Sequence, residues 1–225
     1  MFHGLKRKLR FFRGPDPGND LYVFVMQSCN EVFQRNYFPV SAYGYNVVAG
    51  LKQEVNLPCI ATNRLPIDGG KWEGPEKKRI QLLLDILPVV DAVDVELAAE
   101  ADLREKLISA AHELGKTVIV SHHDFNGTTS MEKIKEMLEM AWQSGGDIAK
   151  FAAKANSPAD TMNLLRVTHE ATRPVCMIAM GDLGKHTRVI APFYGSVLTY
   201  GSIGEAVAPG QLNIAELKRT MKVLL

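Results

Sequence analysis

The sequence lacks several features that would place a protein in a class at once: long apolar runs, paired cysteines and a large net charge. No run approaches the roughly 18 consecutive apolar residues of a membrane span. The 225 residues carry a formal net charge of +1, so the charge indicates no nucleic acid partner and no acidic membrane. The three cysteines, Cys29, Cys59 and Cys176, have no CxxC spacing. This pattern is typical of reduced thiols, and we therefore expect a reducing, cytoplasmic location.

The amino-terminal end is basic but lacks the apolar stretch of a secretory signal. Residues 1–13, MFHGLKRKLRFFR, contain five basic side chains and no acidic one. Because no apolar stretch of about 7–15 residues follows these charges, we expect no cleaved signal peptide. The composition is compatible with an arm that contacts phosphate, and it favours a solvated terminus.

From Val47 onward, short apolar runs alternate with longer amphipathic segments. This alternation predicts parallel strands joined by covering helices. No strand candidate is followed by the G-x-G-x-x-G fingerprint of a dinucleotide-binding open sheet, so the repetition favours an α/β fold of the (β/α)8 barrel type. Ser130 and Ser157 are expected helix N-caps. The predicted strands are 57–64, 89–97, 117–123, 147–152 and 174–180, and the predicted helices are 75–87, 102–114, 130–143, 157–171 and 213–225.

Polar side chains occur where the predicted strands end. In a parallel barrel these carboxyl ends face one mouth, which is where barrel enzymes carry their chemistry. Residues far apart in the sequence can therefore meet there. The residues expected to converge are Arg64, Asp94, Glu96, His123 and Lys150.

Lys150, in the apolar run DIAKFA, is the most informative of these residues. Burial disfavours the charged form of an amine, and a neutral amine can condense with a ketone to form an imine. The protonated imine acidifies the neighbouring carbon, and His123 is the candidate base for that proton. Structural roles are the alternatives: Lys150 can be an ion-pair partner of Asp94 or Glu96, and His123 a hydrogen-bonded core residue.

The remaining histidines give no sign of a metal centre. His122 points to the opposite side of its strand from His123. His112, His169 and His186 have no metal-ligand spacing with one another. We therefore expect no metal site.

Four motifs occur in the order found in type I 3-dehydroquinate dehydratases, a family of shikimate-pathway enzymes. They are VSHHDF, DIAKFA, MGDLGKHTRV and VAPGQL, and the sequence resembles the family from about Leu51 to its C-terminus. The resemblance implies a (β/α)8 barrel, commonly a homodimer, that needs no cofactor. It also implies a hydro-lyase of aromatic amino acid biosynthesis that converts 3-dehydroquinate to 3-dehydroshikimate and water through a lysine imine (a Schiff base).

The resemblance carries catalytic roles to individual residues. Lys150 resembles the imine-forming lysine, and His123 resembles the proton shuttle that removes a C2 proton and then helps the C1 hydroxyl leave. Asp68, in NRLPIDGG, stands where many members have a glutamate that orients the histidine. Asp94 matches an acid that supports the histidine from behind.

The same resemblance implies three substrate-binding residues. Arg64 matches a substrate-binding arginine, and Arg188 matches the arginine that grips the substrate carboxylate, for which a bidentate pair is well suited. Gln211, in VAPGQ, matches a lid glutamine, and the Pro209-Gly210 turn would let the lid close. Val207 stands where some members have a substrate-binding serine.

Residues 1–46 do not follow the family pattern. The family has a Glu-x-Arg motif on its second strand, whereas NEVFQRN has Glu31 and Arg35 at another spacing. We therefore expect an atypical segment over residues 1–46 and a barrel catalytic domain over residues 47–225, incomplete or irregular at its N-terminus. A replaced segment, for instance from a shifted reading frame, and a divergent subfamily are both compatible with this.

Three other readings of the chain are left open. A class I aldolase-like barrel uses the same lysine chemistry on carbon–carbon bonds. A catalytically impaired barrel would retain these motifs without the missing Glu-x-Arg segment. A barrel used only for binding or as a scaffold would show neither imine formation nor turnover.

Overall fold

Parallel β/α units make up most of the described chain. The computed structural model describes residues 22–24, 58–202, 206 and 208–224. Its strands are β1 (Tyr22–Phe24), β2 (Ile60–Thr62), β3 (Ala92–Glu96), β4 (Thr117–Asp124), β5 (Ile148–Lys154), β6 (Val175–Met180) and β7 (Leu198–Tyr200). Its α-helices are α3 (Glu76–Ile86), α4 (Ala101–Glu113), α5 (Met131–Gln143), α6 (Pro158–Glu170), α7 (Thr187–Ile190) and α8 (Ile214–Leu224). Short 3-10 turns are η1 (Pro66–Asp68), η2 (Leu87–Val89) and η3 (Ala191–Tyr194).

The strands follow one another around the sheet in sequence order. The main sheet has the order β2-β3-β4-β5-β6 with parallel pairing throughout, and β7 pairs in parallel with β1. A parallel bridge between Val175 and Ser196 connects the start of β6 to the segment that leads into β7. Parallel strands paired in chain order, each followed by a covering helix, are the arrangement of a (β/α) barrel. The predicted fold class is confirmed.

The predicted strands and helices from residue 58 onward form with small changes at their ends. β2 ends at Thr62, so Arg64 lies just beyond the strand. The expected strand over 89–97 begins only at Ala92, because Pro88 lies in the η2 turn. Ser157 caps α6 as predicted: its hydroxyl accepts from the Asp160 amide while the Asp160 carboxylate accepts from the Ser157 amide.

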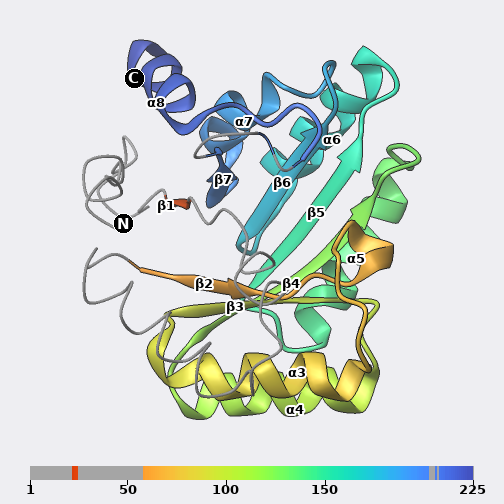
Figure 1. Ribbon diagram of the computed structural model, residues 1–225. Helices are drawn as coiled ribbons and strands as arrows, with labels where there is room; N and C mark the ends of the chain where they lie inside the picture. The colour runs from red at the N-terminus through yellow and green to blue at the C-terminus, as the bar shows by residue number, and fades with distance from the viewer. Residues whose placement is uncertain (1–21, 25–57, 203–205, 207, 225) are drawn as a thin grey trace.

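The alternation of side chains along each strand separates two apolar layers. Val93, Val95, Val118 and Phe151 point outward and pack beneath the helices. Figure 1 shows α3 and α4 side by side beneath β2 and β3. On the other face lies a smaller apolar cluster that lines the inside of the barrel and contains Ile60, Ala92, Ile119, Ala152, Cys176, Ile178, Met180 and Leu198. Burial raises the pKa of the Cys176 thiol in this cluster to about 12.

Several sequence-based predictions fall outside the described residues. These concern Cys29, Glu31, Arg35, Val207 and the proposed boundary after residue 46. Within the described ranges, no helix is both long and apolar enough to cross a membrane. Among these same residues, no group of three or more histidine, cysteine, aspartate or glutamate side chains is arranged to hold a metal ion.

Candidate active site

The inner face of the sheet becomes polar toward the carboxyl ends of β3, β4 and β5. Successive residues of a strand point to opposite faces of the sheet. A residue two positions after an inward-pointing apolar residue therefore also points into the barrel. In this way Ala92 is followed by Asp94 and Glu96, and Ile119 by Ser121 and then His123. Lys150 precedes Ala152 on β5 and pairs in register with Ser121. Sequence-distant polar groups therefore share one end of the barrel.

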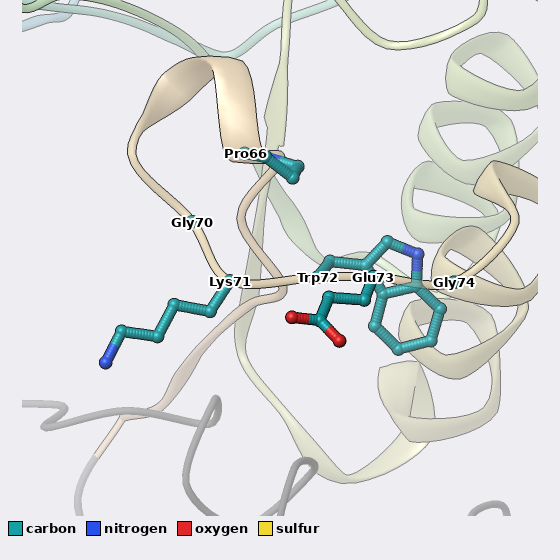
Figure 2. A pocket seen from close by; sticks show the side chains of 6 residues that line it. All are labelled: Pro66, Gly70, Lys71, Trp72, Glu73 and Gly74. Carbon is teal, nitrogen blue, oxygen red and sulfur yellow. The ribbon is translucent and has the colours of Figure 1, made fainter.

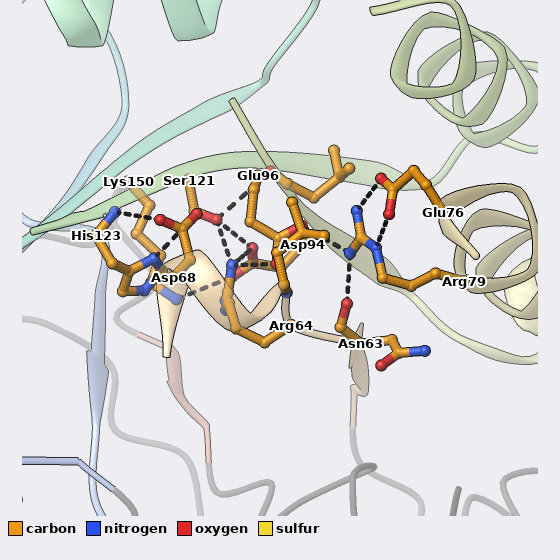
Figure 3. A network of polar contacts seen from close by, with 12 residues as sticks. Asn63, Arg64, Asp68, Glu76, Arg79, Asp94, Glu96, Ser121, His123 and Lys150 are labelled. Carbon is orange, nitrogen blue, oxygen red and sulfur yellow. Dashed lines mark hydrogen bonds and ion pairs between the residues drawn. The ribbon is translucent and has the colours of Figure 1, made fainter. Parts of the chain in front are cut away.

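Asp94 is the centre of the polar cluster shown in Figure 3. The Lys150 ammonium donates to Asp94 Oδ2 at 2.8 Å, and the Lys150 side chain is only 7% exposed. The Arg64 guanidinium donates to both oxygens of the same carboxylate, with Nη1–Oδ1 and Nη2–Oδ2 distances of 2.8 Å. The Ser121 hydroxyl donates to Oδ1 at 2.6 Å. Burial favours the neutral acid, but the charges of Arg64 and Lys150 outweigh it and hold the pKa of Asp94 well below its usual value.

Glu96 forms a second centre on the same strand. Its side chain is fully buried, and Oε1 accepts from Arg64 Nη1 at 3.1 Å and from the Leu65 amide at 3.0 Å. Its other oxygen, Oε2, accepts from Arg79 Nη1 at 2.7 Å. Arg64 thus connects the two carboxylates. It retains its Nε hydrogen and one Nη2 hydrogen without a partner among the described residues.

His123 lies beside Asp68 without making a side-chain hydrogen bond to it. The distance from His123 Nδ1 to Asp68 Oδ2 is 3.9 Å, and both atoms are buried with no hydrogen-bond partner among the residues that the structure describes. The His123 amide reaches the other Asp68 oxygen at 3.4 Å. Phe125 stacks on the His123 ring with a centroid distance of 6.5 Å and an interplanar angle of 15°.

The electrostatics of this pair favour uncharged groups. Burial lowers the pKa of His123 well below its usual value, and the positive charges of Arg64 and Lys150 lower it further. Burial also raises the pKa of Asp68 to about 6, against the attraction of Arg64. At neutral pH the imidazole is therefore neutral and able to accept a proton.

One expected contact differs from the sequence-based prediction. Asp94 was expected to support His123 from behind, but within the described residues it makes no hydrogen bond to the ring, and its charge alone acts to raise the pKa of His123. The reason is competition: Arg64, Ser121 and Lys150 occupy the Asp94 oxygens, and Arg64, Arg79 and the Leu65 amide occupy those of Glu96. Among the described residues, the carboxylate nearest the imidazole is that of Asp68. The ion pair between Lys150 and Asp94, anticipated as a structural alternative, is present.

Arg188 lies apart from the acidic cluster, on the side of β7 and the Pro209-Gly210 turn. It is 2% exposed, and its Nε and Nη2 atoms donate to the carbonyls of Gly210 and Pro209 at 3.0 and 3.1 Å. Its Nη1 reaches the Tyr200 carbonyl at 3.5 Å. Desolvation lowers the pKa of Arg188 to about 10. Gln211 follows this turn directly, and its amide donates to the Ala208 carbonyl at 3.1 Å.

Two side chains at the site were not singled out from the sequence. The Tyr200 ring lies over the Lys150 ammonium, with 4.7 Å between Nζ and the ring centroid. The buried Tyr200 hydroxyl has no hydrogen-bond partner in the described part of the chain. Arg79 is fully buried on α3 and binds Glu96. The period of β7 could have placed Tyr200 inward. The helical period places Arg79 three, four and seven residues before the buried Leu82, Leu83 and Ile86, and this position on the apolar face is the signal that could have separated it from the exposed lysines beside it.

The loop after η1 forms a hollow of its own, shown in Figure 2. Its volume is about 670 Å³, and it is lined by Pro66, Gly70, Lys71, Trp72, Glu73 and Gly74. Neither Lys150 nor His123 lines it. The hollow is therefore separate from the site around Lys150 and His123 and belongs to the loop that follows Asp68.

Both the sequence and the fold of this chain are similar to those of known proteins. The model of the family described as Type I 3-dehydroquinase matches residues 33–224, so the similarity begins upstream of Leu51. The 3-dehydroquinate dehydratase of Methanococcoides burtonii is 50% identical over 179 residues, which cover 80% of this chain and 76% of the relative. The crystal structure of 3-dehydroquinate dehydratase from Geobacillus kaustophilus aligns with a TM-score of 0.77 at 28% identity, over 82% of this chain and 74% of that one. The corresponding structure from Aquifex aeolicus has a TM-score of 0.71 at 35% identity, over 80% and 82% of the two chains.

Proposed function

Because the chain belongs to the type I 3-dehydroquinase family, we propose that it dehydrates 3-dehydroquinate to 3-dehydroshikimate through an imine at Lys150. The reaction is a hydro-lyase step of the shikimate pathway. The observation that carries the proposal is a buried amine, held at 2.8 Å by Asp94, on the same inner face as a neutral imidazole.

Imine formation begins with the amine of Lys150. Asp94 remains ionised, since its pKa is held low by Arg64 and Lys150, so it orients the lysine and is a poor proton acceptor. The ammonium first releases one proton to water, and the neutral amine adds to the C3 carbonyl carbon while an N–H proton moves to the carbonyl oxygen. The carbinolamine then takes up one proton from water on its hydroxyl, which leaves as water and gives the iminium. The cation–π contact with Tyr200 supports positive charge at this position.

His123 acts on the substrate once the iminium has formed. Its imidazole removes a C2 proton, and the C–H electron pair moves into the iminium to give an enamine. The enamine electrons then expel the C1 hydroxyl, which leaves as water with the proton from His123. Hydrolysis of the conjugated imine uses one water, releases 3-dehydroshikimate and restores Lys150, so the net change is the loss of one water.

Substrate binding is assigned to groups around this centre. The guanidinium of Arg188 is proposed to grip the substrate carboxylate with the Nη hydrogens that it does not donate to the Pro209-Gly210 turn. The remaining Nε and Nη2 hydrogens of Arg64 are proposed to reach substrate oxygens, and Gln211 to close over the ligand with its turn. Asp68 is proposed to orient His123. These steps use no cofactor and no metal.

The wider assembly also follows the family resemblance. We propose a cytoplasmic homodimer in which residues 47–225 form the barrel catalytic domain and the preceding segment is atypical. The family-model match begins at residue 33, so residues 33–46 share part of the family pattern.

Ultraviolet absorbance of the conjugated enone product tests the reaction. The purified chain with 3-dehydroquinate is expected to produce the enone, and Lys150→Ala is expected to abolish it because no other amine replaces the nucleophile. Lys154→Ala is the matched control, since Lys154 is exposed at the end of the same strand, and it should retain activity.

Other outcomes of this assay identify the alternatives. Borohydride-trapped imine without enone indicates an aldolase-like or catalytically impaired barrel. The absence of both trapping and enone indicates a binding or scaffold protein and contradicts the proposed function.

A further inference from the structure

Arg79 is a buried cation that none of the proposed chemical steps uses. It lies on α3 with a fully buried side chain, although burial of a guanidinium is unfavourable unless it is paired. Its Nε and Nη2 atoms donate to the two oxygens of Glu76 at 2.7 Å. Its Nη1 donates to Glu96 Oε2 at 2.7 Å and to the Asn63 carbonyl. All of its donor groups are directed at acceptors.

Through these contacts, Arg79 belongs to a continuous series of ion pairs, alternately acidic and basic, that ends at Lys150. Figure 3 shows the series running from helix α3 across the sheet. Each contact in it is an ion pair of 3.1 Å or less. The members in order are Glu76, Arg79, Glu96, Arg64, Asp94 and Lys150.

Arg79 also fixes the backbone on both sides of Arg64. β2 ends at Thr62, and residues 63–65 make no strand pairing with the described residues. Arg79 binds the Asn63 carbonyl directly, and it holds Glu96, which accepts from the Leu65 amide at 3.0 Å. Arg79 therefore helps to hold the guanidinium of Arg64 on Asp94, because it fixes the Asn63 carbonyl on one side of Arg64 and, through Glu96, the Leu65 amide on the other.

We propose that Arg79 is a positioning residue for the imine chemistry: by holding Glu96 and the residues that flank Arg64, it keeps Arg64 on Asp94 and limits how tightly Asp94 holds the Lys150 ammonium. This inference rests on the proposed function. Arg79 itself touches neither Lys150 nor any group assigned to the substrate.

The direction of the effect follows from charge balance. Without Arg79, Arg64 is the one cationic partner left to the buried Glu96 carboxylate within the described part of the chain, and Glu96 draws it away from Asp94. The Asp94 carboxylate is then less neutralised by Arg64 and attracts the Lys150 ammonium more strongly. The substitution also removes the positive charge of Arg79 from the surroundings of Lys150. Both changes favour the ammonium, so a higher pH is needed to form the free amine that attacks the substrate.

Other groups around Lys150 are unchanged by this substitution. They come from the strands on either side and from β7, and they include both polar and titratable side chains. Besides Asp94 and Arg64, they are His123 on β4, Cys176 on β6 and Tyr200 on β7.

The test compares Arg79→Met with Arg166→Met in the full chain. Both variants replace an arginine that is paired with a glutamate on its own helix, but Arg166 is 67% exposed on α6. The measurement is the initial rate of borohydride trapping with 3-dehydroquinate as a function of pH, at a temperature where circular dichroism shows each variant folded. Arg79→Met is expected to move the midpoint of this profile up by about one pH unit. At a given pH below the midpoint, the trapping rate should therefore fall about tenfold. Arg166→Met should match the wild type.

Two further variants keep the inference testable if Arg79→Met does not fold. Arg79→Lys retains the charge and is expected to show a smaller upward shift. Glu96→Gln removes the carboxylate that competes for Arg64, and it is expected to shift the midpoint to lower pH.

Particular results overturn the inference. A folded Arg79→Met with the wild-type profile, or a Glu96→Gln profile without a downward shift, shows that Arg79 serves stability alone. Absence of trapping in the wild type instead contradicts the proposed function, and with it this inference.

Discussion

Asp68 and His123 are close enough to influence each other and too far apart to share a hydrogen bond. Their side-chain atoms Oδ2 and Nδ1 are 3.9 Å apart and buried, and neither has a hydrogen-bond partner within the described ranges. Unpartnered buried polar atoms are rare in folded proteins and often occur at functional sites. A carboxylate one methylene longer would bridge this gap.

We therefore predict that Asp68→Glu strengthens the contact with His123. A carboxylate closer to the ring stabilises the imidazolium and raises the pKa of His123. Since the neutral imidazole is the base, the acid limb of the kcat/KM–pH profile should move to higher pH, by about one unit. Asp68→Asn, which has no charge to offer, is the control and should not move the limb upward. An unchanged limb in Asp68→Glu would show that the two groups do not act together.

At the scale of elements, the helices contribute by fixing the strands that carry the site. α6 covers β6 and packs beside α5, and its first turn is closed by the reciprocal contacts of Ser157 and Asp160. The N-terminal cap of α5 is weaker, because there the Ser130 hydroxyl accepts from one backbone amide, that of Lys133, at 3.3 Å. The two caps therefore differ in the number of amide hydrogens that they satisfy.

This difference predicts unequal losses of stability. Asp160→Ala is expected to lower the free energy of unfolding by about 1 kcal/mol, and Ser130→Ala by less, because the Asp160 carboxylate accepts from two backbone amides, those of Asn156 and Ser157, whereas the Ser130 hydroxyl accepts from one. Chemical denaturation monitored by circular dichroism measures both. Enone formation by the folded variants should equal that of the wild type. Equal losses would mean that the reciprocal contact adds nothing.

The elements were predictable because their signals are local. The cap at Ser157, the apolar faces of the helices and the period of the strands all lie within short windows of sequence. The start of β3 was placed too early because the apolar run 89–97 begins with Val89, the last residue of the η2 turn, whereas the strand begins at Ala92. Short apolar runs do not mark where hydrogen bonding begins.

The partners within the site were less predictable, because they depend on the depth of each residue in the fold. Lys77, Lys78 and Arg79 form one basic run, yet the two lysines are exposed and Arg79 is fully buried. Likewise, the strand period places Asp94 inward but does not decide between His123 and Lys150 as its partner. The sequence therefore predicts which residue types lie at the mouth of the barrel, whereas the way these side chains pair with one another depends on the assembled sheet.

At the scale of the whole molecule, strand order brings the chemistry together. Parallel pairing in chain order places the ends of β3, β4 and β5 next to each other, and the register sets Ser121 opposite both Glu96 and Lys150. The helices bury the outer face, so the polar groups can gather only on the inner one. The lysine, the imidazole and their carboxylates therefore share a site although they come from separate β/α units.

The central claim is that the Lys150 amine forms the covalent intermediate while His123 moves protons. Peptide mass spectrometry of the chain after borohydride reduction with 3-dehydroquinate tests it most directly, since hydride addition to the iminium carbon leaves a stable secondary amine. We predict one modified peptide, with the adduct on Lys150, in both the wild type and His123→Ala, while turnover of His123→Ala falls by about 10²–10⁴-fold. An adduct on another lysine, or none in a wild type that produces enone, would contradict the claim.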